Sequence, residues 1–138
     1  MGVVIAERPS RVKDRVWLEV RREVCDLPAD VGRGGQWLVY LTPGQVDAAW
    51  SRIAAATVEG RLGTTARVST ARPNPKVGGA DTRVICVRTY DAGDEADVMR
   101  VREALRMLGA VRPIAYTVGV VESRYWVNGR PSGARYFV

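Results

Sequence analysis

GGQWLVYL, residues 34–41, is the stretch from which the fold of this chain can be inferred. A pair of glycines leads into a run rich in aromatic and branched apolar side chains, and such a run predicts a buried strand. Thr42 is a good N-cap, Pro43 suits the first position of a helix, and Gln45 completes a capping box with the threonine. The strand is therefore predicted to turn directly into a helix.

This helix, predicted over residues 43–59, is amphipathic, and Gly60 is expected to end it. Apolar and small side chains recur at helical spacing on one side of it: Val46, Ala49, Trp50, Ile53, Ala54 and Thr57. Because Trp37 lies on the strand and Trp50 on the apolar side of the helix, we expect both tryptophans to be buried. A strand that leads into an amphipathic helix indicates a sheet covered by helices.

Further strands are predicted on both sides of this unit. Alternating or β-branched runs predict strands over residues 15–22, 66–71, 82–90 and 112–121, of which 82–90 is expected to be central. Two prolines and two glycines predict an exposed loop over residues 72–79. Residues 123–127 and 134–138 are expected to close the chain as a hairpin around residues 128–131, Asn-Gly-Arg-Pro.

A second helix is predicted between Asp94, a suitable N-cap, and Gly109, a typical C-terminal stop. Its apolar residues form one stripe, and Arg100, Arg102 and Arg106 are expected on its other, solvated faces. The chain is thus predicted to be α+β, with a mixed, mostly antiparallel sheet and two main helices on one face. Residues 1–14 are expected to be a loosely ordered lead-in, and residues 15–138 a single domain.

Residue types that are rare or absent exclude several kinds of site. The chain has no histidine and only two cysteines, so a Cys/His zinc site and a histidine general base are excluded. Cys86 lies in an apolar run, which predicts a buried and inert thiol. The acidic residues at 91–97 are explained by helix capping, so we expect no metal and no cofactor. No apolar run could span a bilayer, and a cytoplasmic location without a membrane partner is expected.

Arginine dominates the positive charge. The formal net charge is +6, and among 21 basic residues only Lys13 and Lys76 are lysines. The planar guanidinium matches phosphate and carboxylate groups, although codon bias in a GC-rich genome would also produce many arginines. Clustering is therefore better evidence for a binding site than the bias itself.

The candidate ligand site lies on the sheet face that the helices leave open. Its basic members are Arg67, Arg72, Lys76, Arg124 and Arg135, with Tyr116, Tyr125 and Trp126 near them in sequence. Arginines bind phosphate oxygens through paired hydrogen bonds, and aromatic rings can stack on a base. The alternative is that outward arginines are simply the solvated side of an antiparallel sheet.

Two family resemblances rest on these segments. The stretch GGQWL, the helix after it, the basic loop and the terminal RYFV resemble the cap-binding translation initiation factor fold, which has a curved sheet. The chain more closely resembles the basophilic leukaemia expressed protein family, also described as a phosphothreonine lyase domain. The segments that carry this second resemblance are QWLV at 36–39, GRLG at 60–63, ARVSTA at 66–71, VICV at 84–87 and DEADV at 94–98.

The resemblance implies a ligand class and also departs from the cap-binding pattern. It implies that Arg72 and Lys76 match the strand and loop that hold cap phosphates. No tryptophan precedes the glycine pair in residues 25–33, so the base sandwich of cap-binding proteins is not predicted. The closer family usually has lysine at the positions of Arg67 and Thr117, so basic character is kept only at the first.

Three functions are compatible with these residues. The preferred one is binding of a phosphate-bearing small molecule or a nucleic-acid end through the open face. An alternative is a metal-independent lyase that eliminates phosphate from phosphothreonine in a phosphoprotein, with Lys76 as the base. A third is a protein-interaction module without a small ligand.

Overall fold

The computed structural model describes residues 7–23, 28–74, 81–118, 126–127, 130–131 and 133–138. It contains a short 3-10 helix (η1, Pro9–Arg11) and two α-helices, α1 (Pro43–Val58) and α2 (Glu95–Met107). The strands are β1 (Trp17–Arg21), β2 (Gly35–Leu41), β3 (Thr65–Ser69), β4 (Arg83–Arg88), β5 (Ala115–Val118), β6 (Trp126–Val127), β7 (Arg130–Pro131) and β8 (Tyr136–Phe137).

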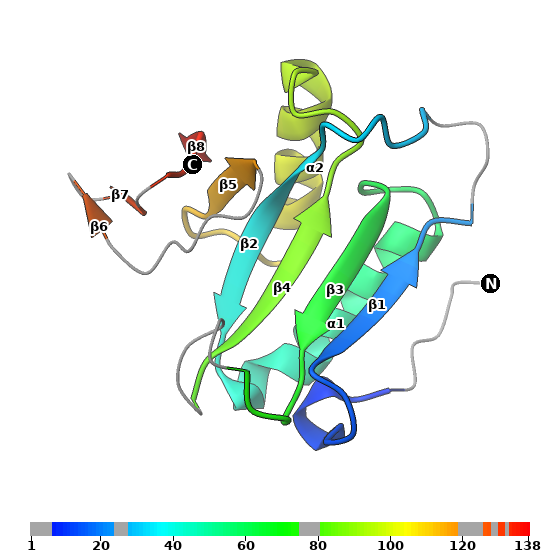
Figure 1. Cartoon of the computed structure of the whole chain (residues 1–138), viewed down its shortest axis with the longest axis vertical. Helices are drawn as coiled ribbons and strands as arrows, with labels where there is room; N and C mark the ends of the chain where they lie inside the picture. Colours follow the sequence, from blue (N-terminus) through cyan, green and yellow to red (C-terminus); the bar gives the residue numbers. More distant parts are fainter. Residues whose placement is uncertain (1–6, 24–27, 75–80, 119–125, 128–129, 132) are drawn as a thin grey trace.

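Six of these strands form one sheet in the order β1-β3-β4-β2-β5-β8, and each neighbouring pair is antiparallel. Figure 1 shows α1 and α2 together behind this sheet, while its other face is turned to the viewer. The predicted α+β fold is confirmed, and β4 is central as expected. In the described residues, no helix is both long and apolar enough to span a membrane.

Register assigns each side chain to one of two faces. Trp37 of β2 lies opposite Val87 of β4 and Tyr116 of β5, and these side chains face the helices. The next residue, Leu38, lies opposite Cys86 and Ala115, so these three point to the open face.

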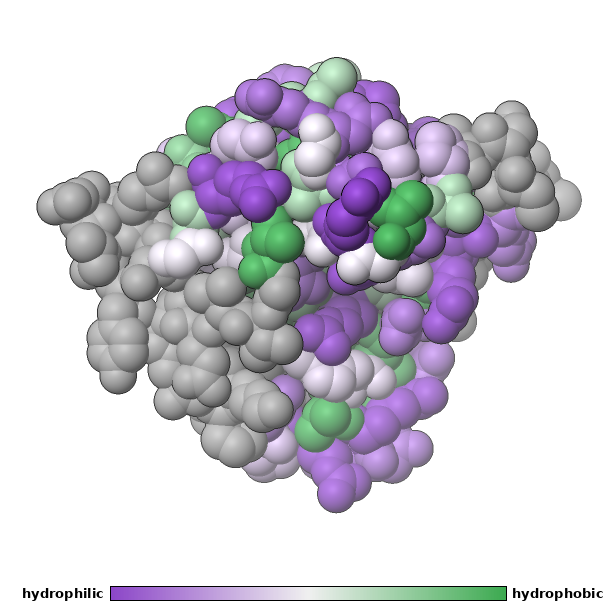
Figure 2. All heavy atoms as spheres, turned by 45° about the horizontal axis from the view of Figure 1, so that its top comes forward, coloured by the Kyte–Doolittle hydropathy of each residue, from purple (hydrophilic) through white to green (hydrophobic). Residues whose placement is uncertain are grey.

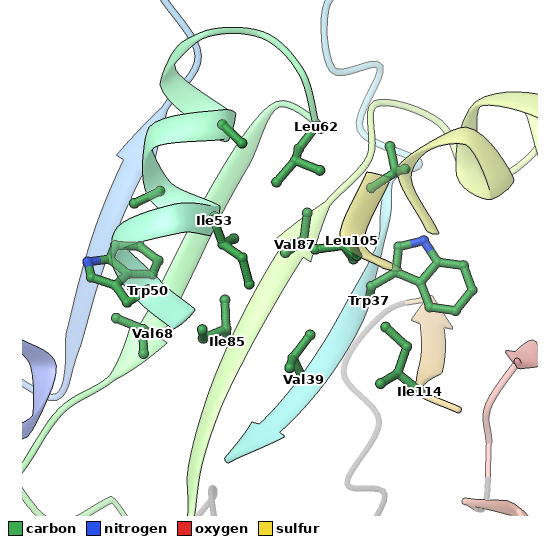
Figure 3. Close-up of a cluster of buried hydrophobic side chains, with 14 of the residues drawn as sticks. Trp37, Val39, Trp50, Ile53, Leu62, Val68, Ile85, Val87, Leu105 and Ile114 are labelled. Atoms are coloured by element: carbon green, nitrogen blue, oxygen red, sulfur yellow. The ribbon is translucent and has the colours of Figure 1, made fainter. Parts of the chain in front are cut away.

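The core lies between the sheet and the helices, and both tryptophans predicted to be buried are there. Trp37 is 0% exposed and Trp50 is 1% exposed. Figure 3 shows Trp50 of α1 near Val68 of β3, and Trp37 extending from β2 toward α2. The indole Nε1 of Trp37 donates a hydrogen bond of 3.0 Å to the main-chain oxygen of Val98, which ties α2 to the sheet.

The helix boundaries follow the predicted capping residues. The side chain of Gln45 accepts a hydrogen bond from the Thr42 amide at 3.1 Å, as a capping box requires. Asp94 accepts from the Asp97 amide at 3.1 Å at the start of α2. Gly60 and Gly109 follow the helices with φ of 80° and 110°, a conformation that favours glycine.

The glycine pair at the start of β2, Gly34 and Gly35, is needed for close packing rather than for backbone freedom. A Cβ at Gly34 would lie 2.3 Å from the main-chain oxygen of Thr89. A Cβ at Gly35 would lie 2.6 Å from both the Thr117 oxygen and the Tyr116 ring. The two glycines therefore allow β2 to approach its neighbours where larger residues would clash.

Two predictions about the C-terminal part are wrong. The described residues of the expected closing hairpin do not pair with each other, because β6 pairs with β7 and β8 pairs with β5; residues 123–125 of this prediction lie outside the described residues. Arg102 is not on a solvated face of α2, since it is only 1% exposed. Arg100 and Arg106 are more accessible, and each forms an ion pair with an acidic residue of α2.

Candidate functional site

A row of polar side chains crosses the open face of the sheet. The cross-strand register places its members side by side on β1, β3, β4, β2 and β5: Arg21, Thr65, Arg88, Gln36 and Thr117. We call these five residues the polar row. In the tilted view of Figure 2, hydrophilic residues predominate on the described surface and hydrophobic residues lie among them.

Next to the polar row lies a small apolar cluster. Leu38, Val84 and Cys86 pack together on the open face with Trp17 against them, and each of the three is at most 6% exposed. Burial raises the pKa of the Cys86 thiol, which therefore stays protonated at neutral pH. The prediction that this cysteine is buried is confirmed, and the apolar cluster offers little surface to a ligand.

Arg67 of β3 lies beside the apolar cluster, in the row of side chains next to the polar row. Its guanidinium carbon is 4.1 Å from the centroid of the Trp17 ring, and its backbone lies opposite that of Cys86 on β4. Arg67 is two residues from Thr65, which pairs with both Arg21 and Arg88. Diagonal neighbours on adjacent strands are within reach of long side chains. Three arginines of three adjacent strands thus lie on the open face, with the guanidinium of Arg67 turned toward Trp17.

Arg88 is held by an acidic partner from the loop before β2. Its Nε donates to Oδ2 of Asp30 at 2.5 Å, and its Nη2 donates to Oδ1 at 3.3 Å. The Asp30 carboxylate also accepts a hydrogen bond of 2.8 Å from the Gly32 amide. The hydrogen bond from the Arg88 guanidinium holds the pKa of Asp30 below its usual value.

In contrast, Arg21 is exposed, and it forms no ion pair within the described ranges 7–23, 28–74 and 81–118. Its guanidinium is therefore available to an anion from solvent. Glu19, the other charged residue of β1 on this face, lies opposite Arg67. The local balance of Arg21, Arg67 and Arg88 against Glu19 and Asp30 is positive.

Two predicted site residues lie away from this group. Arg72 follows β3, is exposed, and its Nη1 donates to the main-chain oxygen of Asp14 at 3.2 Å. Arg135 precedes β8 near the opposite edge of the sheet, and its Nη1 donates to the oxygen of Ala92 at 3.3 Å. Neither contact brings these arginines to Arg67.

The structure places Tyr116 on the face covered by the helices, where it is 0% exposed. Its hydroxyl shares a hydrogen bond of 2.7 Å with Thr89, and its ring contacts those of Trp37 and Tyr136. Burial raises the pKa of this phenol. The expectation that Tyr116 meets a ligand on the open face is therefore wrong, because alternation along β5 turns Thr117 to that face instead.

The remaining predicted residues, Lys76, Arg124 and Tyr125, lie outside the described residues, and so does the side chain of Trp126. Within the described part of the chain, no group of three or more acidic, cysteine or histidine residues could hold a metal ion.

Three members of the observed site were not predicted: Arg21, Arg88 and Asp30. Sequence alternation places Arg21 on the same side of β1 as Trp17, and Arg88 is two residues from Cys86. These positions could have been identified from the two-residue period of a strand. Asp30 lies in a loop, where no periodic signal exists.

One known protein family matches most of the chain. The sequence model of the family "Basophilic leukemia-expressed protein Bles03" matches residues 10–120. The chain belongs to this family. The Bles03 match spans both helices and strands β1 to β5, including every residue of the polar row.

Solved structures with a similar fold are translation initiation factors. The Ascaris suum eIF4E-3 complex with an m2,2,7G cap has a TM-score of 0.56 at 19% identity, over 79% of this chain and 59% of that one. A schistosome eIF4E with m7GpppG and 4E-BP has a TM-score of 0.55 at 17% identity, over 79% of this chain and 60% of that one. C. elegans eIF4E-3 with the 4E-binding protein Mextli and a cap analog has a TM-score of 0.51 at 21% identity, over 64% of this chain and 52% of that one.

This Bles03-family chain thus spans less than two thirds of the length of each of these factors. At identities of 17–21%, the likeness establishes a common fold, in agreement with the fold predicted from the sequence.

Proposed function

We propose that this Bles03-family protein binds a phosphate-bearing ligand, a nucleotide or a nucleic-acid end, on the open face of its sheet. The observation that carries the proposal is that Arg21, Arg67 and Arg88 lie on the open face of three adjacent strands. Guanidinium groups bind phosphate oxygens through short, charge-assisted and often bidentate hydrogen bonds. The hydroxyl of Thr65 and the amide of Gln36 add neutral hydrogen-bonding groups in the same row.

The similar solved structures support this ligand class. They are complexes with cap nucleotides or a cap analog, which contain phosphate, and two of them also contain a 4E-binding protein. A nucleotide is therefore a reasonable first ligand to test for this chain, and a protein partner is a reasonable second.

The arrangement of aromatic residues favours recognition of phosphate over recognition of a base. Trp37 and Trp50 are both in the core, and Arg67 covers one face of the Trp17 ring. These three tryptophans thus provide no pair of rings between which a base could stack. We expect nucleotides with different bases and equal numbers of phosphates to bind with similar affinity.

Binding should depend steeply on salt and on the open-face arginines. A fluorescently labelled nucleoside triphosphate, followed by anisotropy, is expected to lose affinity as ionic strength rises. Arg67→Gln and Arg21→Gln should each weaken binding about tenfold, because each removes a charge-assisted hydrogen bond. Arg52→Gln on the outer side of α1 makes the same change in net charge far from the site and should have little effect.

Two results would contradict this proposal. Binding that does not respond to salt or to Arg67→Gln would exclude an ionic site on the open face. A complete lack of binding to phosphorylated ligands would favour an interaction module instead.

A separate assay tests the lyase alternative. A phosphothreonine peptide incubated with the protein is expected to keep its phosphate, because no histidine is available as an acid or base. Lys76→Arg should retain most of the ligand affinity, since guanidinium keeps the charge but cannot serve as a base. Detection of the unsaturated product by mass spectrometry, lost in Lys76→Arg, would show that the protein is an enzyme.

A further inference from the structure

We propose that Asp30 is an internal competitor of the ligand: its carboxylate occupies the donors of Arg88 that a phosphate would use. This inference rests on the proposed phosphate site and adds to it the residue that controls access to one of its arginines. A phosphate that binds Arg88 through Nε and Nη2 must first displace the carboxylate from these two donors. Asp30 would therefore favour ligands with a higher negative charge than a carboxylate.

The first argument is the geometry of the ion pair. Nε and Nη2 of Arg88 donate to the two carboxylate oxygens of Asp30, at 2.5 and 3.3 Å. This side-by-side arrangement is the one in which a guanidinium also binds two phosphate oxygens. One guanidinium edge cannot serve both anions at once, so an incoming phosphate and Asp30 compete for the same atoms.

The second argument is that the carboxylate can leave without unfolding its loop. The backbone near Asp30 has its own attachments, in which the Val31 amide donates to the Tyr90 oxygen at 3.3 Å and the Ala92 amide donates to the Arg33 oxygen at 2.9 Å. A rotation of the Asp30 side chain is therefore enough to free Arg88. Both partners are partly accessible, with side-chain exposures of 37% for Arg88 and 32% for Asp30.

The third argument concerns which anions can displace Asp30. Ion pairs that water reaches contribute little to stability, so the cost of opening this one is small. A simple carboxylate would replace Asp30 with no gain in charge. A polyphosphate carries more charge and more acceptor oxygens, and it can contact Arg21 and Arg67 at the same time. The competition therefore selects for phosphate-rich ligands.

The experiment measures affinity for a labelled nucleoside triphosphate in matched variants. Asp30→Asn keeps the size of the side chain but removes its charge, and we expect it to tighten binding about three- to tenfold. Glu103→Gln is the control: it removes one negative charge from an exposed position on α2, where Glu103 pairs with Arg106. This control should change affinity less than about twofold.

A double-mutant cycle tests whether Asp30 acts through Arg88. In an Arg88→Gln background the same Asp30→Asn substitution should have no effect, because the contested donors are gone. Thermal unfolding of each variant verifies that it is folded. Asp30→Glu keeps the carboxylate and should not reproduce the gain of Asp30→Asn.

The outcomes separate this inference from the proposed function. If the unmodified protein binds the probe in a salt-dependent way but Asp30→Asn binds no better than Glu103→Gln, the competition is wrong and the phosphate site stands. Weaker binding by Asp30→Asn would show that Asp30 positions Arg88 for the ligand, which also overturns competition. If neither the unmodified protein nor Asp30→Asn binds the probe, the proposed function fails and this inference fails with it.

Discussion

Trp50→Ala is expected to lower the free energy of unfolding by about 3–5 kcal/mol. The indole of Trp50 is 1% exposed and belongs to the core cluster between α1 and the sheet. Its removal loses the transfer free energy of a large apolar group and leaves a cavity that the surrounding helix and strands can only partly fill. Urea unfolding followed by far-ultraviolet circular dichroism would measure the change.

Met107→Ala is a suitable control for this measurement. Met107 lies at the end of α2 with 88% of its surface exposed, so its truncation should change stability by less than about 0.5 kcal/mol. A loss of less than about 1 kcal/mol in Trp50→Ala would mean that Trp50 does not contribute to the core as its burial indicates.

The parts of the fold that were predicted correctly depend on local signals. Capping residues such as Thr42 and Asp94 act within three or four positions of the helix that they start. Alternation along β1 and β4 likewise requires only neighbouring residues. The partner strand of β8 cannot be predicted from local signals, because the pairing of β8 with β5 joins residues about twenty positions apart in sequence. The turn signal that Asn128 and Gly129 carry in the sequence gave no information on that choice.

The candidate site could be predicted only in part for the same reason. Alternation along β3 correctly places Arg67 on the open face. Alternation along β1 and β4 places Arg21 and Arg88 on the same face. Tyr116 could not be placed, because the strand predicted over residues 112–121 had no fixed register. Its face follows from the pairing of Trp37 with Tyr116, which only the structure gives. Asp30 is recruited by a long-range ion pair, for which the sequence carries no signal.

Arg102 is the largest departure from the sequence pattern, and its environment explains why. Each of its nitrogens donates to a main-chain oxygen at 2.9 Å: Nε to Val138, Nη1 to Ala110 and Nη2 to Arg112. The guanidinium carbon also lies 5.9 Å from the centroid of the Trp37 ring. Burial lowers the pKa of this arginine, but an arginine still remains charged at neutral pH. Arg102 thus connects α2, the loop after it and the segment after β8.

Arg102→Met is accordingly expected to destabilise the protein by about 3–5 kcal/mol, because it removes the buried guanidinium and its three hydrogen bonds to main-chain oxygens at once. Arg102→Lys should recover only part of this loss, since a single ammonium cannot reach three separated carbonyls with the geometry of a guanidinium. Arg106→Met, one turn along the same helix, removes a more accessible arginine and should cost less than about 1 kcal/mol. Hydrogen exchange should locate the effect, with faster exchange of the Ile114 and Val138 amides, which pair the two segments that Arg102 joins. Equal stability of Arg102→Met and Arg106→Met would show that the three hydrogen bonds do not hold this part of the fold together.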